Sequence, residues 1–186
     1  MSIRGEQKFE VMKIPKSNRK KALILVDVQP DFVYKRKTNT VRNIQDLLKS
    51  VKYEAYVECI FHAEKGSLWD KETGWTLPKN KKFHTVGDIL KLLPEDTIHI
   101  EKTTKSAFKG NKNIEIFLKK KGIKEVHIVG FDTNDCVLAT AYESFDLGFF
   151  TYVIEECVQS SSSNKINEHA LNLLRHVNLT NKSFIV

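Results

Sequence analysis

Short runs of consecutive apolar residues alternate along the chain with stretches of helical periodicity. The apolar runs are typical of strands buried on both faces, and they cover residues 22–28, 57–61, 97–100, 126–129 and 149–154. Residues 183–186 would form a last short strand. Helical patterns lie between the runs, at about 41–52, 85–92, 111–121, 135–147 and 165–175. We therefore expect a three-layer αβα fold, Rossmann-like, with a mainly parallel six-stranded sheet and helices on both faces.

The domain organisation follows from length and composition. A chain of 186 residues suits one globular domain, with neither an internal repeat nor an interdomain linker. Residues 1–19 are polar and basic with isolated apolar positions, and we expect them to form an N-terminal arm or a short extra strand. Residues 20–186 then form the single domain. The serines at 160–163 indicate a loop.

The N-terminal segment lacks the apolar core of a secretory signal. No apolar run approaches the roughly 20 residues that a membrane-spanning helix needs. From these two features we expect a cytoplasmic protein with no membrane partner.

The formal net charge of +7 raises the question of nucleic-acid binding. The lysines are scattered, however, and acidic residues are interspersed among them nearly everywhere. The basic runs at 79–82 and 119–121 are typical of a loop and an exposed helix end. No known binding module accompanies the charge, so we expect a solvated surface and no nucleic-acid partner. Such a field would still attract anionic substrates.

The three cysteines are Cys59, Cys136 and Cys157. An odd number without a CxxC pair argues against a disulfide framework or a zinc knuckle. Each cysteine is therefore either a buried thiol or a reactive one. Cys59 and Cys157 fall within or beside expected strands, which favours a structural role for both.

Three chemically active residues are expected at one edge of the sheet. In open parallel sheets, ligands bind beyond the carboxyl ends of the strands. Asp27 interrupts the end of the first strand, and Lys102 follows the strand that ends at Ile100. Cys136 opens the helix that follows the strand ending at Gly130.

Each of these residues also has a plainer interpretation. Cys136 lies in the first turn of a helix, where N–H groups and the helix dipole favour a thiolate and could receive an oxyanion; it could also be a small buried hydrophobe. A carboxylate such as Asp27 inside an apolar run is costly unless paired or catalytic, although it could cap a loop. Lys102 alone could be a solvated loop residue. Together they supply a base, a cation and a nucleophile.

Three segments resemble the signature motifs of the isochorismatase-like cysteine hydrolases, which include nicotinamidases and N-carbamoylsarcosine amidohydrolases. The segments are ALILVDVQPDF, KTTKSAF and GFDTNDCVLATAYESFDLGF, at residues 22–32, 102–108 and 130–149. Their order and spacing match, and the resemblance extends from about residue 20 to the C-terminus. The resemblance implies a catalytic triad of Asp27, Lys102 and Cys136.

The resemblance also implies a cis peptide between Phe131 and Asp132, with the backbone N–H groups of Asp132 and Cys136 forming the oxyanion hole. The implied reaction is hydrolysis of a small amide or carbamoyl-type substrate through a thioester. Alternatives are C–O hydrolysis of the isochorismatase type or a non-catalytic, ligand-binding member. Isochorismatases proper lack the cysteine, so Cys136 favours acyl chemistry. The family often forms dimers or tetramers, and we expect a homo-oligomer.

The chain departs from the nicotinamidase pattern at the metal site. That pattern places Asp-x-His and a further His just after the second strand, whereas residues 59–67 hold a single histidine, His62. Lys65 stands near the place of the second histidine. We therefore expect neither a metal nor another cofactor.

Substrate contacts are expected from side chains that follow strand ends. Trp69 is a candidate pocket wall, and His62 could line the pocket or be an ordinary surface histidine. For a single aromatic residue, a place in the core is the alternative. The expected substrate-binding residues are Phe32, His62, Trp75 and Phe131.

Overall fold

A six-stranded parallel sheet forms the centre of the computed structural model, which describes residues 12–13, 17–79, 84–181 and 184–185. Its strand order is β4-β3-β2-β5-β6-β7, and every neighbouring pair is parallel. The strands are β2 (Lys21–Val26), β3 (Ala55–Phe61), β4 (Ile98–Lys102), β5 (Glu125–Gly130), β6 (Phe150–Val158) and β7 (Thr180–Asn181). This confirms the three-layer α/β fold expected from the sequence.

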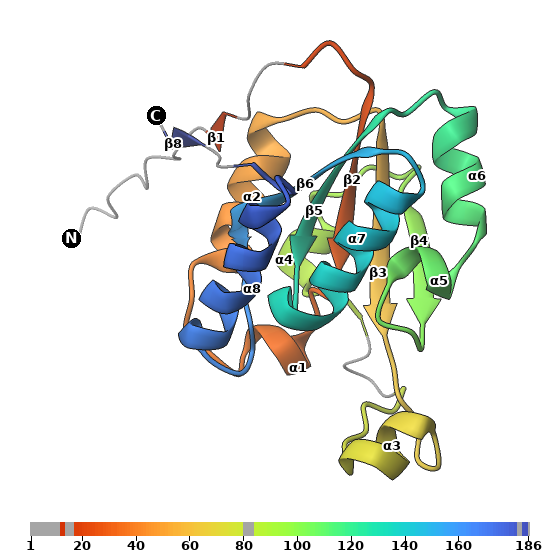
Figure 1. Cartoon of the computed structure of the whole chain (residues 1–186), viewed down its shortest axis with the longest axis vertical. Helices are drawn as coiled ribbons and strands as arrows, with labels where there is room; N and C mark the ends of the chain where they lie inside the picture. The colour runs from red at the N-terminus through yellow and green to blue at the C-terminus, as the bar shows by residue number, and fades with distance from the viewer. Residues whose placement is uncertain (1–11, 14–16, 80–83, 182–183, 186) are drawn as a thin grey trace, which may run out of the picture.

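Helices cover both faces of the sheet (Figure 1). The longer ones are α2 (Thr40–Ser50), α6 (Asn113–Lys120), α7 (Leu138–Asp146) and α8 (Asn164–His176). The shorter ones are α1 (Pro30–Val33), α3 (Leu68–Thr73), α4 (Gly87–Leu90) and α5 (Ala107–Gly110), with a π-helical turn, η1, at Thr133–Val137. Figure 1 shows α3 projecting from the body of the fold.

Strand β2 contributes side chains to two hydrophobic cores, because successive side chains point to opposite faces of the sheet. Ala22, Ile24 and Val26 pack in one core with residues of α6, α7 and α8. Leu23 and Leu25 pack in the other core with residues of α1, α2 and α4. An apolar run with no polar alternation is therefore what a central strand of this sheet requires.

The prediction that the last strand joins the main sheet was wrong. Of residues 183–186, Phe184–Ile185 form β8, which pairs antiparallel with β1 (Met12–Lys13) and lies outside the main sheet. The sixth strand of the sheet is β7, which pairs with β6 at Val153 and Thr180. Leu179 is buried just before β7, so the chain reaches the sheet edge directly after α8.

Apart from β1 and residues 17–19, the predicted N-terminal arm lies outside the described residues, and the boundary at residue 20 stays a prediction. Within the described residues, no helix combines the length and apolar character needed to cross a bilayer. The three cysteines are all buried and free.

The strand order places a topological switch at β2, whose neighbours are β3 on one side and β5 on the other. Chains leaving the carboxyl ends of strands on the two sides of a switch point diverge and leave a crevice between them. Asp27 follows β2, and the turn that carries Cys136 follows β5. The fold therefore brings two of the three predicted residues to this crevice.

Gly130 allows β2 and β5 to lie close together at the switch point. Its φ is +117°, and a Cβ on it would lie 2.0 Å from the Val26 carbonyl oxygen. Only glycine fits this position, because both the backbone conformation and the space exclude a side chain.

We expect Gly130→Ala to lower the free energy of unfolding by at least about 3 kcal/mol, since it combines a steric clash with a strained backbone. Urea unfolding monitored by circular dichroism measures the loss. Gly148→Ala is the matched control, because Gly148 also has a positive φ but a Cβ on it would meet no atom within 4 Å. Equal losses in the two variants would contradict the role given to the Val26 contact.

Candidate active site

Asp27 begins the site at the carboxyl end of β2. Its backbone has a positive φ of 51°, a conformation that aspartate tolerates better than most residues. Its N–H donates to the Cys59 carbonyl at 2.9 Å. Gln29 fixes the same edge, since its side chain accepts from the Phe61 N–H at 2.7 Å and donates to the Phe61 carbonyl at 3.1 Å. The turn after β2 is thereby bonded to the end of β3.

Lys102 reaches Asp27 from the end of β4. Its Nζ lies 2.7 Å from Asp27 Oδ2, and neither side chain is exposed to solvent. Lys102 also donates to the Thr104 carbonyl at 3.1 Å and lies 4.9 Å from the centre of the Phe61 ring. A pair of opposite charges fully removed from water needs this kind of mutual contact to persist.

The pKa values of Asp27 and Lys102 both lie above their usual values, for different reasons. Burial raises the pKa of Asp27 to about 6, although the charge and hydrogen bond of Lys102 and the nearby Cys136 side chain oppose the rise. Burial alone would lower the pKa of Lys102, but the Asp27 charge outweighs it and raises that pKa to about 12. At neutral pH the pair is therefore a carboxylate beside an ammonium.

Cys136 contacts the same carboxylate from the turn after β5. The two groups interact electrostatically, and Asp27 Oδ1 accepts no hydrogen bond from the described residues. Burial raises the pKa of the thiol well above its usual range, and the Asp27 charge raises it further. The thiol therefore keeps its proton while Asp27 is charged.

The turn that carries Cys136 has an unusual backbone. The Phe131–Asp132 peptide is cis, at the position that the resemblance implied. The Val137 N–H then donates to the Asp132 carbonyl at 3.1 Å, an i→i+5 bond that makes the turn π-helical. The Thr140 hydroxyl donates to the Cys136 carbonyl at 2.7 Å and so anchors the turn to α7.

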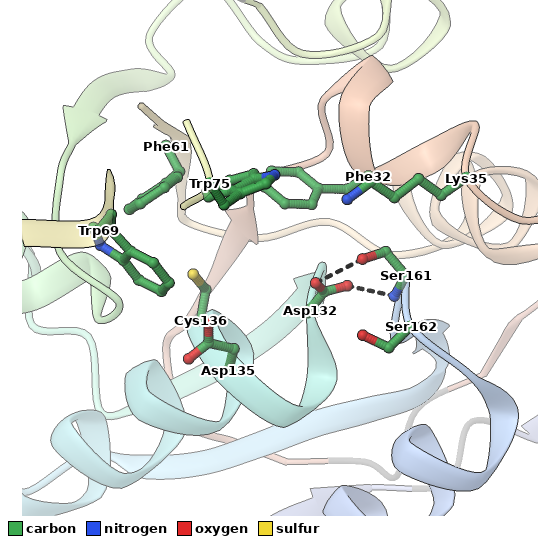
Figure 2. Close-up of a pocket in the computed structure, with 10 residues that line it drawn as sticks. All are labelled: Phe32, Lys35, Phe61, Trp69, Trp75, Asp132, Asp135, Cys136, Ser161 and Ser162. Atoms are coloured by element: carbon green, nitrogen blue, oxygen red, sulfur yellow. Dashed lines mark hydrogen bonds between the residues drawn. The ribbon is translucent and has the colours of Figure 1, made fainter. Parts of the chain in front are cut away.

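A cavity of about 160 Å³ opens in front of the Cys136 sulfur (Figure 2). Its apolar walls are the rings of Phe32, Phe61, Trp69 and Trp75; the Phe61 and Trp75 rings stack with centres 5.9 Å apart. The polar side chains that line it are Lys35, Asp132, Asp135, Ser161 and Ser162.

The structure brings only some of the expected substrate contacts to this cavity. Phe32 and Trp75 line it, as does Trp69. Phe131 is only 1% exposed and packs in the core shared with α2 and α4, because its side chain turns inward from the end of β5. His62 is also outside the lining; its ring nitrogen lies 3.6 Å from the Glu64 carboxylate.

The sequence argument missed four of the polar lining residues, namely Lys35, Asp135, Ser161 and Ser162. Ser161 and Ser162 were interpreted only as part of a loop. That loop follows the carboxyl end of β6, so the rule that selected Asp27 and Lys102 could have found them.

Breaking the buried pair should destabilise the protein in a pH-dependent way. We expect Lys102→Met to cost about 3–5 kcal/mol near pH 8, because it leaves an uncompensated buried carboxylate. Without Lys102 the folded-state pKa of Asp27 rises further above its unfolded value, so stability is lost as pH rises through that folded pKa. Urea unfolding at pH 5 should show a smaller deficit than at pH 8. A deficit that is equal at both pH values would contradict this origin.

Comparison with solved structures gives the same fold. The pyrazinamidase of Pyrococcus horikoshii in complex with zinc superposes with a TM-score of 0.71, at 24% identity, over 87% of this chain and 97% of that one. The described residues of this chain hold no group of three or more His, Cys, Asp or Glu side chains that could bind a metal ion. At the end of β3, His62 and Glu64 provide one imidazole and one carboxylate, which is too few donors for a zinc site.

Sequence relatives point to the same group of proteins. The uncharacterised isochorismatase family protein YrdC of Bacillus subtilis (strain 168) is 35% identical over 154 residues, which are 74% of this chain and 72% of that protein. The ureidoacrylate amidohydrolase RutB of Caulobacter segnis is 31% identical over 98 residues, which are 53% of this chain and 40% of that protein.

A family model matches most of the chain. The isochorismatase domain model matches residues 21–182, a range that contains the whole parallel sheet and all the residues that line the cavity. The chain therefore belongs to the isochorismatase family of hydrolases.

Proposed function

We propose that this hydrolase cleaves a small amide or carbamoyl-type substrate through a thioester on Cys136, without a metal ion. The observation that supports the proposal is the place of Cys136, which lines an aromatic-walled cavity and interacts electrostatically with the buried Asp27–Lys102 pair. The Cys136 sulfur points toward the aromatic walls of that cavity (Figure 2), and Asp27 Oδ1 accepts no hydrogen bond from the described residues. A nucleophile, its base and a supporting cation thus meet where a substrate can enter.

The proton balance defines the role of Asp27 in the proposed reaction. As the sulfur attacks the carbonyl carbon, the thiol proton passes to the Asp27 carboxylate, and the carbonyl electrons move to oxygen. The C–N bond then breaks, and Asp27 returns the proton to the leaving nitrogen. Water next attacks the thioester and gives a proton to Asp27, which protonates the sulfur as the acid product forms.

Lys102 keeps its proton throughout these steps. Its raised pKa suits a fixed positive charge that stabilises the carboxylate and the developing thiolate. We assign the oxyanion to the backbone N–H groups of Asp132 and Cys136. The relatives support an amide substrate, because RutB is an amidohydrolase by name and the structural neighbour a pyrazinamidase.

Removal of the nucleophile should abolish the reaction. We expect Cys136→Ala to lower turnover by more than about 10³-fold, because the covalent step cannot occur. The assay is ammonia release from a panel of small amides, with and without a chelator. Cys157→Ala is the control, since Cys157 is fully buried away from the cavity lining. Full activity in Cys136→Ala, or loss of wild-type activity on adding chelator, would refute the proposal.

The pH dependence should follow the titration of Asp27. Because Asp27 must be a carboxylate to accept the thiol proton, kcat/KM should fall as pH drops through a pKa of about 6. Below that value the decline approaches tenfold per pH unit. Asp27→Asn should remove nearly all activity at every pH. A profile that is flat between pH 5 and 7 would exclude Asp27 as the base.

A further inference from the structure

Most charged groups at the cavity already have a partner within the protein. Asp27 is paired with Lys102, and the Asp135 carboxylate forms an ion pair with Lys105 at the rim. Both oxygens of Asp132 accept hydrogen bonds from Ser161, one from its N–H and one, at 2.8 Å, from its hydroxyl. These carboxylates therefore need no cation from a substrate.

Lys35 is the exception among the cavity-lining charges. Within the described part of the chain, its ammonium has no carboxylate within 4.0 Å. Lys35 is an exposed residue, and its side chain extends toward the Phe32 ring, on the Asp132 and Ser161 side of the cavity (Figure 2). Its nitrogen lies 5.8 Å from the centre of the Phe32 ring and 5.7 Å from that of Trp75.

We propose that Lys35 binds a carboxylate carried by the substrate, so that the enzyme acts on small acidic amides. This deepens the proposed function and rests on it for the amide. In this arrangement the amide carbonyl lies at Cys136 and the substrate body lies between the aromatic walls. The carboxylate lies at the other end of the cavity, beside the Lys35 ammonium.

The positive charge of Lys35 favours an acidic substrate over a neutral or cationic one. A cationic substrate would meet the Lys35 ammonium in a partly enclosed, aromatic-walled space, where repulsion is screened less than in water. The nearby Asp132 carboxylate interacts with Lys35 electrostatically, but its oxygens already accept hydrogen bonds from Ser161 and it forms no ion pair with Lys35 within 4.0 Å. The formal net charge of +7 adds a field that draws anions toward the protein as a whole.

Protection of Cys136 from alkylation tests this subsite without requiring turnover. The probes are succinamate and succinamide, which have nearly the same shape and differ by one negative charge. The initial rate of iodoacetamide labelling of Cys136, followed by peptide mass spectrometry, reports occupation of the cavity. We expect succinamate to halve this rate at a concentration at least tenfold lower than succinamide.

Substitutions at Lys35 identify the group responsible. Lys35→Ala should abolish the preference for succinamate, and Lys35→Arg should keep most of it. Lys37→Ala is the matched control, a nearby lysine outside the cavity lining, and should behave as wild type. Equal protection by the two probes in the wild type, or an unchanged preference in Lys35→Ala, would overturn the subsite.

Ammonia release from the same two probes separates the subsite from the reaction. If succinamate protects Cys136 through Lys35 but no amide in the panel is hydrolysed, the subsite stands and the proposed function fails. If amides are hydrolysed while protection shows no preference for charge, the function stands and the subsite fails.

Discussion

The buried contact between Lys102 and Asp27 is the interaction on which the rest of the site depends. Placing two charges beyond the reach of water is unfavourable unless they meet each other in good geometry. Here the geometry comes from the sheet: Asp27 follows β2, Lys102 ends β4, and β3 lies between them with Phe61 paired to Lys102. The pair is therefore a product of strand register, and it holds a carboxylate with an elevated pKa at the place where we propose a base for Cys136.

The same contact bears on the role that we propose for Cys136. Burial raises the pKa values of the Cys59 and Cys157 thiols, so both keep their protons. Cys59 also interacts with Asp27 and Lys102, and Cys136 differs from it by lining the cavity. In the proposed reaction, a carboxylate already compensated by an ammonium takes the thiol proton with little net change in the charge of the site, so a thiolate need not exist before the substrate arrives.

The sequence predicted the features that follow from strand ends. Uninterrupted apolar runs located the five long strands, and the polar residues at their carboxyl ends were Asp27, Lys102 and, one turn later, Cys136. Lys102 contacts Asp27, and Cys136 lies in the turn after the carboxyl end of β5, so the three residues lie at one edge of the sheet. The sixth strand escaped prediction because β7 is only two residues long, too short to show a periodicity.

The loop residues of the cavity were harder to predict. Lys35, Ser161 and Asp135 lie in segments whose direction depends on tertiary contacts rather than on local pattern. Phe131 is the opposite case: it belongs to a signature motif, but its side chain packs in the core and does not line the cavity. Position next to a strand end thus indicates proximity to the site, whereas the direction of a side chain is decided by what the neighbouring elements leave open.

The origin of the aromatic walls has a consequence for how such an enzyme diversifies. Trp69 and Trp75 come from the projecting segment around α3, which is joined across its base by a bridge between Ala63 and Leu77 (Figure 1). Asp27, Lys102 and Cys136, to which we assign the chemistry, come from the sheet edge. Because the two parts are separate in the chain, mutations around α3 can change these two walls without touching the three residues. Under the proposed function, a lineage with this fold can acquire new substrates by exchanging one peripheral segment while it keeps its reacting groups.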